Sequence, residues 1–308
     1  MSSSAWRTID FTSAAGELHY ERGQVVFVRA ETDERQTVPL AQVAVILIGA
    51  KTSISGGLLT KLSDEDVAVV VCDWRNVPVA AALPWRDHTR IGARQKAQSE
   101  LTEPRRKNAW SRIVKAKIHG QANTAAALGN EQLGKQLEQL AAKVVSGDPH
   151  NVEALAARQY WEGVTSDPRF ARHPGAREEG LNSALDYAYT ILRGQGIKAL
   201  SGAGLTGTIG VFHRNRGNPF ALVDDLIEPF RPAVDYYLLA SDSDFDLNKK
   251  EVKGAIFLAA NQVFDATGHT IPTVQEDFAQ QFGKYVEGDS RFLDVPTWRG
   301  PFDAEDGE

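Results

Sequence analysis

Two carboxylates, Asp225 and Glu228, stand three residues apart in a segment whose apolar residues recur at helical spacing. On a helix, residues at i and i+3 project from one face about one turn apart. Carboxylates placed that close repel each other unless a positive charge lies between them. A divalent cation would supply that charge, and Arg231, another three residues on, could supply a second. In isolation such a cluster is more often an acidic, solvated helix start.

A third carboxylate, Glu153, lies in a helix that we expect to begin at Pro149. Asp148 can accept hydrogen bonds from the free amides of a first turn, and proline is tolerated there because its missing N–H would have no partner. Apolar residues from Val152 to Tyr160 then share one face, and Glu153 lies next to that stripe. Glu153 is therefore expected at the edge of the core, although most helical glutamates are solvated surface residues.

His213 precedes a loop in which Arg214, Arg216 and Gly217 could approach a phosphate backbone. An imidazole can bind a metal or move a proton, but a lone histidine is more often a hydrogen-bonded structural residue. Sixty residues separate Glu153 from His213. Spacing alone therefore does not join the three segments into one site.

The charge of the chain is unevenly distributed. A net charge of −6 and a pI of about 5.7 argue mildly against nucleic acid as a partner, because duplex binding usually rests on a basic surface. The segment 86–117 is nevertheless strongly basic, and a solvated helix face explains it as well as a phosphate-binding face does. Its basic residues are Arg86, Arg90, Arg94, Lys96, Arg105, Arg106, Lys107, Arg112, Lys115 and Lys117.

The residues before position 84 have the patterns of short strands. Residues 6–11 alternate large apolar with polar side chains, and residues 25–28 are rich in β-branched and aromatic types. Residues 43–48 and 67–72 are continuous apolar runs, as expected for strands buried on both faces. Between these two runs, Ser55 could cap a short helix.

Beyond position 84 the apolar residues follow helical spacing, as in Trp110, Ile113, Val114 and Lys117 at i, i+3, i+4 and i+7. We therefore predict an α+β protein. A small β-sandwich-like domain at 1–84 is followed by a larger all-α domain at 85–308, which ends in a short acidic tail.

Several classes of protein are excluded. The single cysteine, Cys72, cannot form an internal disulfide or a thiolate-cluster metal site, and its apolar neighbours predict a small buried side chain. No window approaches the twenty or so apolar residues that a membrane span needs, and the first residues lack the pattern of a signal peptide. We therefore expect a cytoplasmic protein with no membrane partner.

Several motifs, taken in chain order, resemble the family of CRISPR-associated integrases. They are Gly-Asp-Pro-x-Asn-x-Glu at 147–153, the segment 181–193, Ala-Gly-Leu at 203–205, His-Arg-Asn at 213–215 and Asp-Leu-Ile-Glu-Pro-Phe-Arg-Pro at 225–232. Residues 6–10 and 70–73 resemble the type II branch, so the resemblance covers nearly the whole chain. This chain departs from the family pattern at Ala154, where glycine is common, and at Thr206-Gly207, where Asp-Pro is common.

The resemblance implies a helical catalytic domain in which Glu153, His213 and Glu228 hold Mg²⁺ or Mn²⁺, supported by Asp225 and Arg231. It implies a metal-dependent DNA endonuclease and integrase that inserts spacer DNA into a CRISPR array by attack of a 3′-OH on a phosphodiester. Implied partners are double-stranded DNA (spacer precursor and CRISPR repeat), a second copy of the chain joined through the β-domain, and a small second CRISPR-associated adaptation protein. The candidate DNA-binding residues are Arg86, Arg90, Arg94, Arg214 and Arg216.

Two other hypotheses remain. A non-catalytic DNA-binding scaffold would bind duplex without metal, and a metallohydrolase of a small acidic or phosphorylated molecule is favoured only by the net charge of −6. DNA affinity that falls steeply with salt separates either DNA hypothesis from the hydrolase. Because only neutral imidazole binds metal, an integrase that uses His213 should lose activity below about pH 6.

Overall fold

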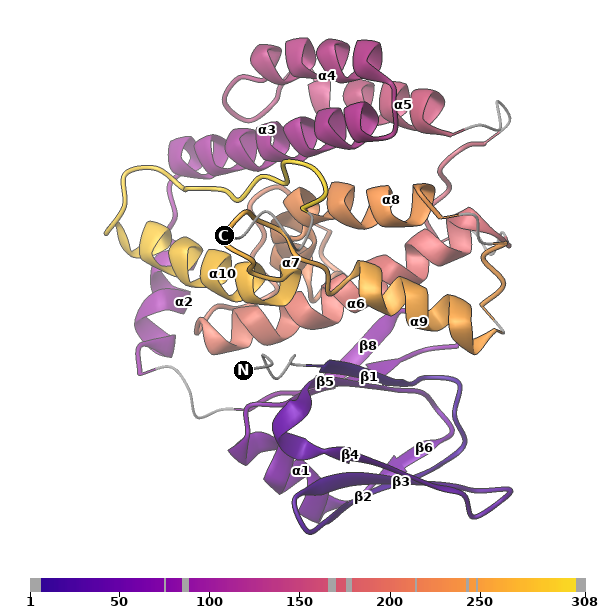
Figure 1. Cartoon of the computed structure of the whole chain (residues 1–308). Helices are drawn as coiled ribbons and strands as arrows, with labels where there is room; N and C mark the ends of the chain where they lie inside the picture. Colours follow the sequence, from indigo (N-terminus) through magenta and orange to yellow (C-terminus); the bar gives the residue numbers. More distant parts are fainter. Residues whose placement is uncertain are drawn as a thin grey trace.

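The computed structural model describes residues 7–74, 76–84, 89–165, 170–175, 179–213, 215–241, 244–247 and 249–302. The candidate DNA-binding residues Arg86 and Arg214 and the acidic tail at 303–308 lie outside these residues. Two β-sheets occupy one end of the molecule, and helices from position 91 onward form the rest (Figure 1). The expected α+β class is confirmed.

The first sheet lies between the second sheet and the helices. Its strands, in spatial order, are β1 (Arg7–Phe11), β5 (Val43–Ile48), β7 (Ala68–Cys72) and β8 (Pro78–Ala82). β5 pairs in parallel with β1 and β7, and every residue of β5 is buried. Val45 and Leu47 belong to the core shared with the helices, whereas Ile46 and Ile48 belong to the core between the sheets. The continuous apolar run therefore predicted burial on both faces correctly.

The second sheet and one helix complete the β-rich end. The strands, in spatial order, are β4 (Arg35–Pro39), β3 (Gln24–Arg29), β2 (Gly16–Glu21) and β6 (Thr52–Ile54), and the helix is α1 (Gly56–Asp64). Ser55 Oγ accepts a hydrogen bond of 3.2 Å from the Leu58 amide. Ser55 is thus the cap of this helix, as its sequence position indicates.

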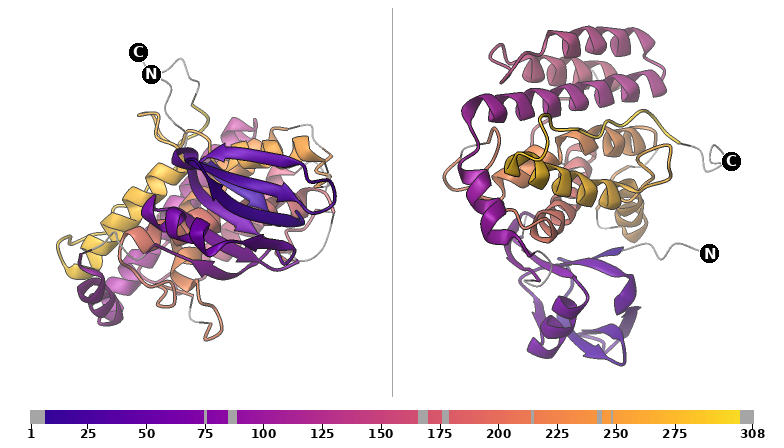
Figure 2. Two further views of the ribbon diagram at one scale, coloured as in Figure 1. Left: turned by 90° about the horizontal axis from the view of Figure 1, so that it is seen from below. Right: turned by 90° about the vertical axis from the view of Figure 1, so that its left-hand side faces the viewer.

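The helical part has two layers above the first sheet (Figures 1 and 2). Its helices are α2 (Ile91–Ser99), α3 (Glu103–Ala127), α4 (Glu131–Lys143), α5 (Val152–Val164), α6 (Leu181–Gly202), α7 (Ala221–Leu226), α8 (Arg231–Leu239), α9 (Lys250–Ala259) and α10 (Ile271–Glu287). α3, α4 and α5 form the layer farthest from the sheets. α6 contacts β5, where a Cβ on Gly194 would lie 3.2 Å from Leu47. No helix within the described ranges is long and apolar enough to cross a membrane.

The helix that carries Glu153 begins later than its sequence indicates. α5 begins at Val152 and not at Pro149, because residues 148–151 form a turn in which the Asn151 amide donates to the Asp148 carbonyl at 3.0 Å. Asn151 then has a left-handed φ of 51°. Asp148 still caps the first turn, because its carboxylate accepts from the amides of Val152 (3.0 Å) and Glu153 (2.9 Å).

Candidate active site

Glu153 and Glu228, 75 residues apart in the chain, face each other across the ammonium group of Lys117. Lys117 Nζ lies 2.5 Å from Glu153 Oε1 and 2.7 Å from Glu228 Oε2. Arg231 Nη2 contacts the other oxygen of Glu228 at 3.1 Å. Three parts of the fold meet here: α3 carries Lys117, α5 carries Glu153, and the α7–α8 junction carries the other two residues.

These charges balance one another inside the protein. Lys117 is 8% exposed and Glu228 is 4% exposed. Burial favours the neutral form of each group, but Arg231 and Lys117 hold the pKa of Glu228 below its ordinary value. Glu228 and Glu153 likewise hold the pKa of Lys117 above its ordinary value. The Glu228 carboxylate and the Lys117 ammonium therefore remain ionised at neutral pH.

Asp225 and Glu228 do not share a helix face, contrary to the expectation from their spacing. α7 ends at Leu226, and Glu228 begins the 3₁₀ turn Glu228–Phe230. Pro229 has no N–H to donate to the Asp225 carbonyl, so the α-helical hydrogen-bond ladder stops there. The resulting bend directs Glu228 to Lys117, whereas Asp225 contacts the His213 loop.

Asp225 holds the imidazole of His213 and the backbone before it. Asp225 is fully buried, and its Oδ1 lies 2.6 Å from His213 Nδ1. Its Oδ2 accepts from the amides of Val211 (2.5 Å) and Phe212 (3.0 Å). The hydrogen bond to Asp225 raises the pKa of His213 above its ordinary value, and burial raises the pKa of Asp225. Because Nδ1 is held in this way, Nε2 is the imidazole nitrogen that could bind a ligand.

The loop that enters His213 is held by contacts from two sides, despite its departure from the family pattern. The side chain of Gln98 on α2 bonds both the amide (3.1 Å) and the carbonyl (2.9 Å) of Thr206. The Gly207 carbonyl accepts from the Leu222 amide at 2.8 Å. Gly210 is required for close approach, since a Cβ there would lie 2.5 Å from the His213 carbonyl.

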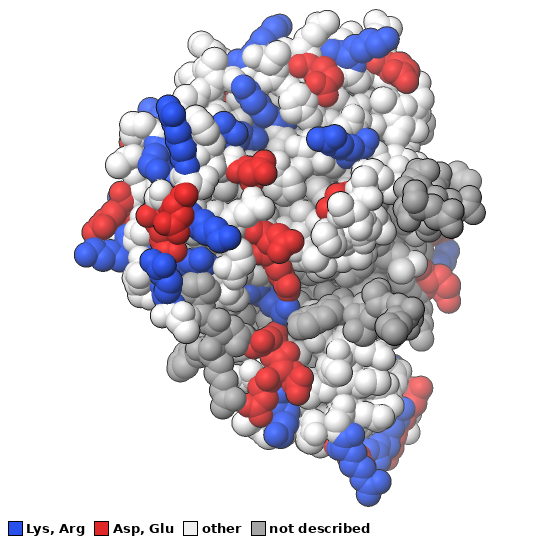
Figure 3. Space-filling view, turned by 60° about the vertical axis from the view of Figure 1, so that its left-hand side comes forward, with Lys and Arg blue, Asp and Glu red and all other residues white. Residues whose placement is uncertain are grey.

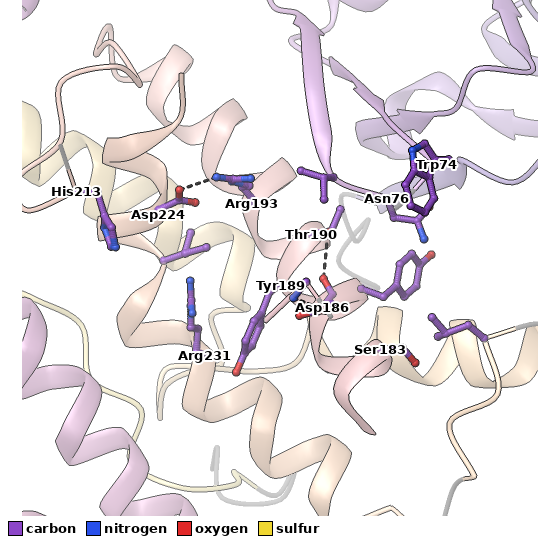
Figure 4. A pocket seen from close by; sticks show the side chains of 15 residues that line it. Trp74, Asn76, Ser183, Asp186, Tyr189, Thr190, Arg193, His213, Asp224 and Arg231 are labelled. Carbon is purple, nitrogen blue, oxygen red and sulfur yellow. Dashed lines mark hydrogen bonds and ion pairs between the residues drawn. The ribbon is translucent and has the colours of Figure 1, made fainter. Parts of the chain in front are cut away.

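His213 lies between two hollows of the surface. One is a pocket of about 540 Å³ between the β7–β8 turn, α6 and α7, lined by Trp74, Arg193, His213 and Arg231 among others (Figure 4). Trp74 is 66% exposed there, and Arg193 pairs with Asp224 at 2.6 Å. The other is a hollow of about 560 Å³ that Arg106, His213 and Arg216 line. The imidazole of His213 therefore borders both hollows, and a phosphate backbone could lie in either of them.

Much of the basic segment 86–117 turns inward. Arg94 is only 6% exposed and bonds Glu287 (3.1 Å), Gln280 (2.8 Å) and the Ala203 carbonyl (2.7 Å). The guanidinium of Arg94 therefore joins α2 to α10, and in this arrangement little of it is exposed to a DNA partner. Arg105 likewise donates to the carbonyls of Tyr285 and Ser290.

Other basic candidates remain at the surface. The Arg90 side chain is 61% exposed while pairing with Glu287 at 2.9 Å, and Arg216 is exposed. On the face shown in Figure 3, Lys and Arg side chains are interspersed with Asp and Glu and do not form one continuous basic patch. A DNA interface on this face would therefore use separate arginines.

The carboxylates and the imidazole at this site are side chains that can bind a divalent ion, but they do not stand in a metal-binding arrangement. Across the described residues, no group of three or more His, Cys, Asp and Glu side chains is placed to hold a metal. Glu153 and Glu228 nevertheless converge on a single cation, and carboxylate oxygens with one imidazole suit Mg²⁺ or Mn²⁺. Glu228 Oε2 is buried and accepts no hydrogen bond from the described residues. The Lys117 ammonium stands where such an ion would bind both carboxylates.

Three residues of this site were not predicted from the sequence: Lys117, Tyr189 and Asp235. Lys117 continues the apolar stripe of α3, and a lysine on a buried helix face signals a carboxylate partner. Asp235 is 2% exposed and accepts from Tyr189 (2.5 Å) and Tyr160 (3.3 Å), while Arg231 lies 4.7 Å above the Tyr189 ring. Burial raises the pKa of Asp235 to about 7. No local pattern marks Tyr189 or Asp235 as members of the site.

Comparison with known proteins identifies similar chains. Residues 11–260 match the family model described as CRISPR associated protein Cas1. A CRISPR-associated endonuclease Cas1 of Neisseria meningitidis is 36% identical over 231 residues, which are 75% of this chain and 74% of that one. Among solved structures, a casposase bound to an integration product has a TM-score of 0.77 at 18% identity and covers 98% of this chain and 97% of its own. A Cas6-RT-Cas1–Cas2 complex has a TM-score of 0.73 at 17% identity, with 97% of this chain and 36% of that one covered.

Proposed function

The chain belongs to the Cas1 family of CRISPR-associated proteins, and from this premise we propose that it is a divalent-metal-dependent DNA endonuclease and integrase. The observation that carries the proposal is the convergence of Glu153 and Glu228 on one cation, beside an imidazole oriented by Asp225. The name of the relative at 36% identity, an endonuclease, supports the same class of activity.

In this proposal Glu153, Glu228 and His213 Nε2 hold Mg²⁺ or Mn²⁺. When bound, the ion supplies positive charge that lowers the pKa of an attacking hydroxyl and offsets charge that develops on the phosphate. Asp225 keeps the imidazole oriented. Arg231 remains beside Glu228 as a positive charge near the reacting phosphate.

The proposed reaction is in-line transfer at phosphorus. A 3′-OH of the spacer precursor attacks a phosphodiester of the CRISPR repeat, a new P–O bond forms, and the bond to the leaving 3′-oxygen breaks. The proton of the attacking hydroxyl goes to solvent, and the leaving oxygen takes one up. If water attacks instead, the product is a nick, so one site accounts for both nuclease and integrase activity.

The two hollows beside His213 suit the two DNA strands that such a reaction must bring together. We assign the pocket with Trp74, Arg193 and Arg231 to the strand that ends in the 3′-OH, because an exposed indole can stack on a terminal base. The hollow with Arg106 and Arg216 would hold the target strand, whose backbone offers phosphates to guanidinium groups. Arg90, at the surface beside α2, is a further candidate for duplex DNA.

Two protein partners belong to the proposal. One is a second copy of the chain, joined through the β-rich end, where strand edges can pair. The other is a small second adaptation protein, as the Cas1–Cas2 complex among the structural neighbours suggests.

The deciding experiment is strand transfer of a short labelled duplex with free 3′-OH ends into a supercoiled plasmid. Wild type is compared with Glu153→Gln and with Glu138→Gln, an exposed glutamate of α4 as the matched control, with Mg²⁺, Mn²⁺ or chelator and with the small partner protein. We expect metal-dependent joining that Glu153→Gln lowers at least about a hundredfold and Glu138→Gln leaves unchanged.

Other outcomes select the competing hypotheses. Duplex binding without joining under any of these conditions would favour the non-catalytic scaffold. Metal-dependent hydrolysis of small phosphate esters, with no salt-dependent DNA affinity, would favour the small-molecule hydrolase.

A further inference from the structure

The cation between the two proposed metal-binding carboxylates belongs to the protein itself. Lys117 Nζ contacts Glu153 Oε1 at 2.5 Å and Glu228 Oε2 at 2.7 Å. An ion held by the same two oxygens, with metal–oxygen distances near 2.1 Å, would overlap the ammonium group. The lysine and the ion therefore cannot occupy this position together.

The contacts of Lys117 are good enough to hold the carboxylates together but leave one oxygen incompletely satisfied. Glu228 Oε2 is buried and accepts no hydrogen bond from the described residues, although the ammonium is close by. The contact with Glu228 is thus a close ion pair, at 2.7 Å, whose angles are not those of a well-aligned hydrogen bond. A buried carboxylate oxygen in this state gains from a ligand that binds it directly.

A place for the displaced ammonium lies next to the site. Lys117 also lines a pocket of about 460 Å³, and the charged residues around it are Glu162, Asp235, Arg158, Arg172 and Arg231. Rotation about the bonds of its flexible side chain could carry the ammonium from the two glutamates toward this pocket. Glu162 and Asp235 would attract the ammonium there, and the arginines of the same pocket would repel it, so the pocket offers it space more than compensating charge.

We propose that Lys117 is a built-in counter-ion of the metal-free protein and that a divalent ion enters the site by displacing it. This inference rests on the proposed function, because it assumes that Glu153 and Glu228 are metal ligands. In the metal-free state Lys117 suppresses the repulsion between the two carboxylates, which stabilises the fold and weakens the apparent metal affinity. Lys117 is thus a positioning residue that sets how readily the ion is taken up.

The test is calorimetric titration of the full chain with Mn²⁺, comparing wild type with Lys117→Met and Lys115→Met. Methionine keeps the length of the lysine stem and removes its charge. Lys115 lies two residues away on the same helix, is only partly buried and serves as the matched control. We expect Lys117→Met to bind Mn²⁺ at least about tenfold more tightly than wild type. Lys115→Met should bind it as wild type does.

A thermal readout accompanies the titration. Metal-free Lys117→Met should unfold at a lower temperature than wild type, and Mn²⁺ should raise its unfolding temperature by more than it raises that of wild type. Should Lys117→Met fail to fold, Lys117→Arg keeps a cation at the position and is expected to bind Mn²⁺ no more tightly than wild type. Tighter binding by Lys117→Arg would refute the proposal.

The outcomes separate this inference from the proposed function. Equal or weaker Mn²⁺ binding by folded Lys117→Met, with clear binding by wild type, would overturn the counter-ion role and leave the integrase proposal intact. If neither wild type nor Lys117→Met binds Mn²⁺, both proposals fail.

Discussion

At the scale of single residues, the state of His213 depends on one buried carboxylate. The hydrogen bond that His213 Nδ1 donates to Asp225 raises the pKa of His213, so the imidazole is protonated over a wider range of pH than a free one. Because a metal binds only the neutral ring, Mn²⁺ binding should weaken by about tenfold per pH unit below this pKa. The loss should therefore begin at a higher pH than the value of about 6 expected from an unperturbed histidine.

This first prediction can be measured by NMR. The imidazole resonance of His213 in the metal-free protein, assigned by its disappearance in His213→Gln, should titrate with a midpoint above the ordinary value of 6.5. A midpoint at or below 6.5 would contradict the role assigned to Asp225.

A second prediction at this scale concerns Asp235. Its pKa in the folded protein, about 7, lies above the ordinary 3.8, so the folded state holds the proton more tightly than the unfolded state does. Stability from this group is therefore greatest at low pH and decreases as pH rises from about 4 to about 7. Asp235→Asn removes the buried charge. Its amide oxygen can still accept from Tyr189, and its amide nitrogen can donate to the hydroxyl oxygen of Tyr160.

We expect Asp235→Asn to be more stable than wild type at pH 8 by a few kcal/mol, since each pKa unit is worth about 1.4 kcal/mol. The difference in stability between Asp235→Asn and wild type should be smaller at pH 5. Urea denaturation at the two pH values measures it, with Asp277→Asn, an exposed position on α10, as the control. A variant less stable than wild type at both pH values would show that the charge of Asp235 is needed.

At the scale of elements, α2 is joined to α10 by a buried ion pair. The Arg94 guanidinium lies against Gly283, where a Cβ would come within 2.5 Å of it, and it pairs with Glu287, whose side chain is 7% exposed. Removing Arg94 would leave the buried Glu287 carboxylate with the more exposed Arg90 as its partner, and would leave the Ala203 carbonyl without its donor. The position of α2 matters for the site because Gln98, on the same helix, holds the loop that enters His213.

The third prediction follows from this packing. Arg94→Ala should lower the free energy of unfolding by about 3 kcal/mol, whereas Arg216→Ala, at an exposed position, should change it by less than about 0.5 kcal/mol. Denaturant unfolding of the two variants makes the comparison. An Arg94→Ala protein as stable as wild type would restore Arg94 as a candidate for binding DNA.

At the scale of the whole molecule, the net charge of −6 must be reconciled with a DNA substrate. Arg94 and Arg105 of the basic segment hydrogen-bond backbone carbonyls of other parts of the fold. On one face of the molecule, the exposed Lys and Arg side chains are interspersed with Asp and Glu (Figure 3). Binding would then depend on the phosphate contacts made by arginines near the two hollows and would weaken as salt rises.

The fourth prediction is that DNA affinity falls steeply with salt and that Arg216→Ala lowers the slope of log K against log salt by about one. Fluorescence anisotropy of a labelled duplex at several salt concentrations measures both slopes. Arg94→Ala, assayed where it remains folded, should leave the slope unchanged. Equal slopes for wild type and Arg216→Ala would remove Arg216 from the proposed interface.

Local patterns in the sequence were sufficient to predict several helices and strands. The apolar run at 43–48 predicted a strand covered on both faces, and Ser55 marked the start of α1. Asp148 was correctly assigned to cap the helix that carries Glu153, although the helix begins three residues later than Pro149 indicated. These features depend on backbone groups within about one helical turn or on the pattern of a single strand, so a short stretch of sequence contains them.

Tertiary structure alone decided how the charges pair. The motifs identified Glu153, His213 and Glu228 as a set, but nothing in them indicated that Lys117 lies between the two glutamates or that Arg94 is buried against α10. Partners in these pairs are 36 to 193 residues apart in the chain. Which charges meet depends on how α3, α5, α7 and α10 pack, and the strength of each pair depends on the burial that this packing produces.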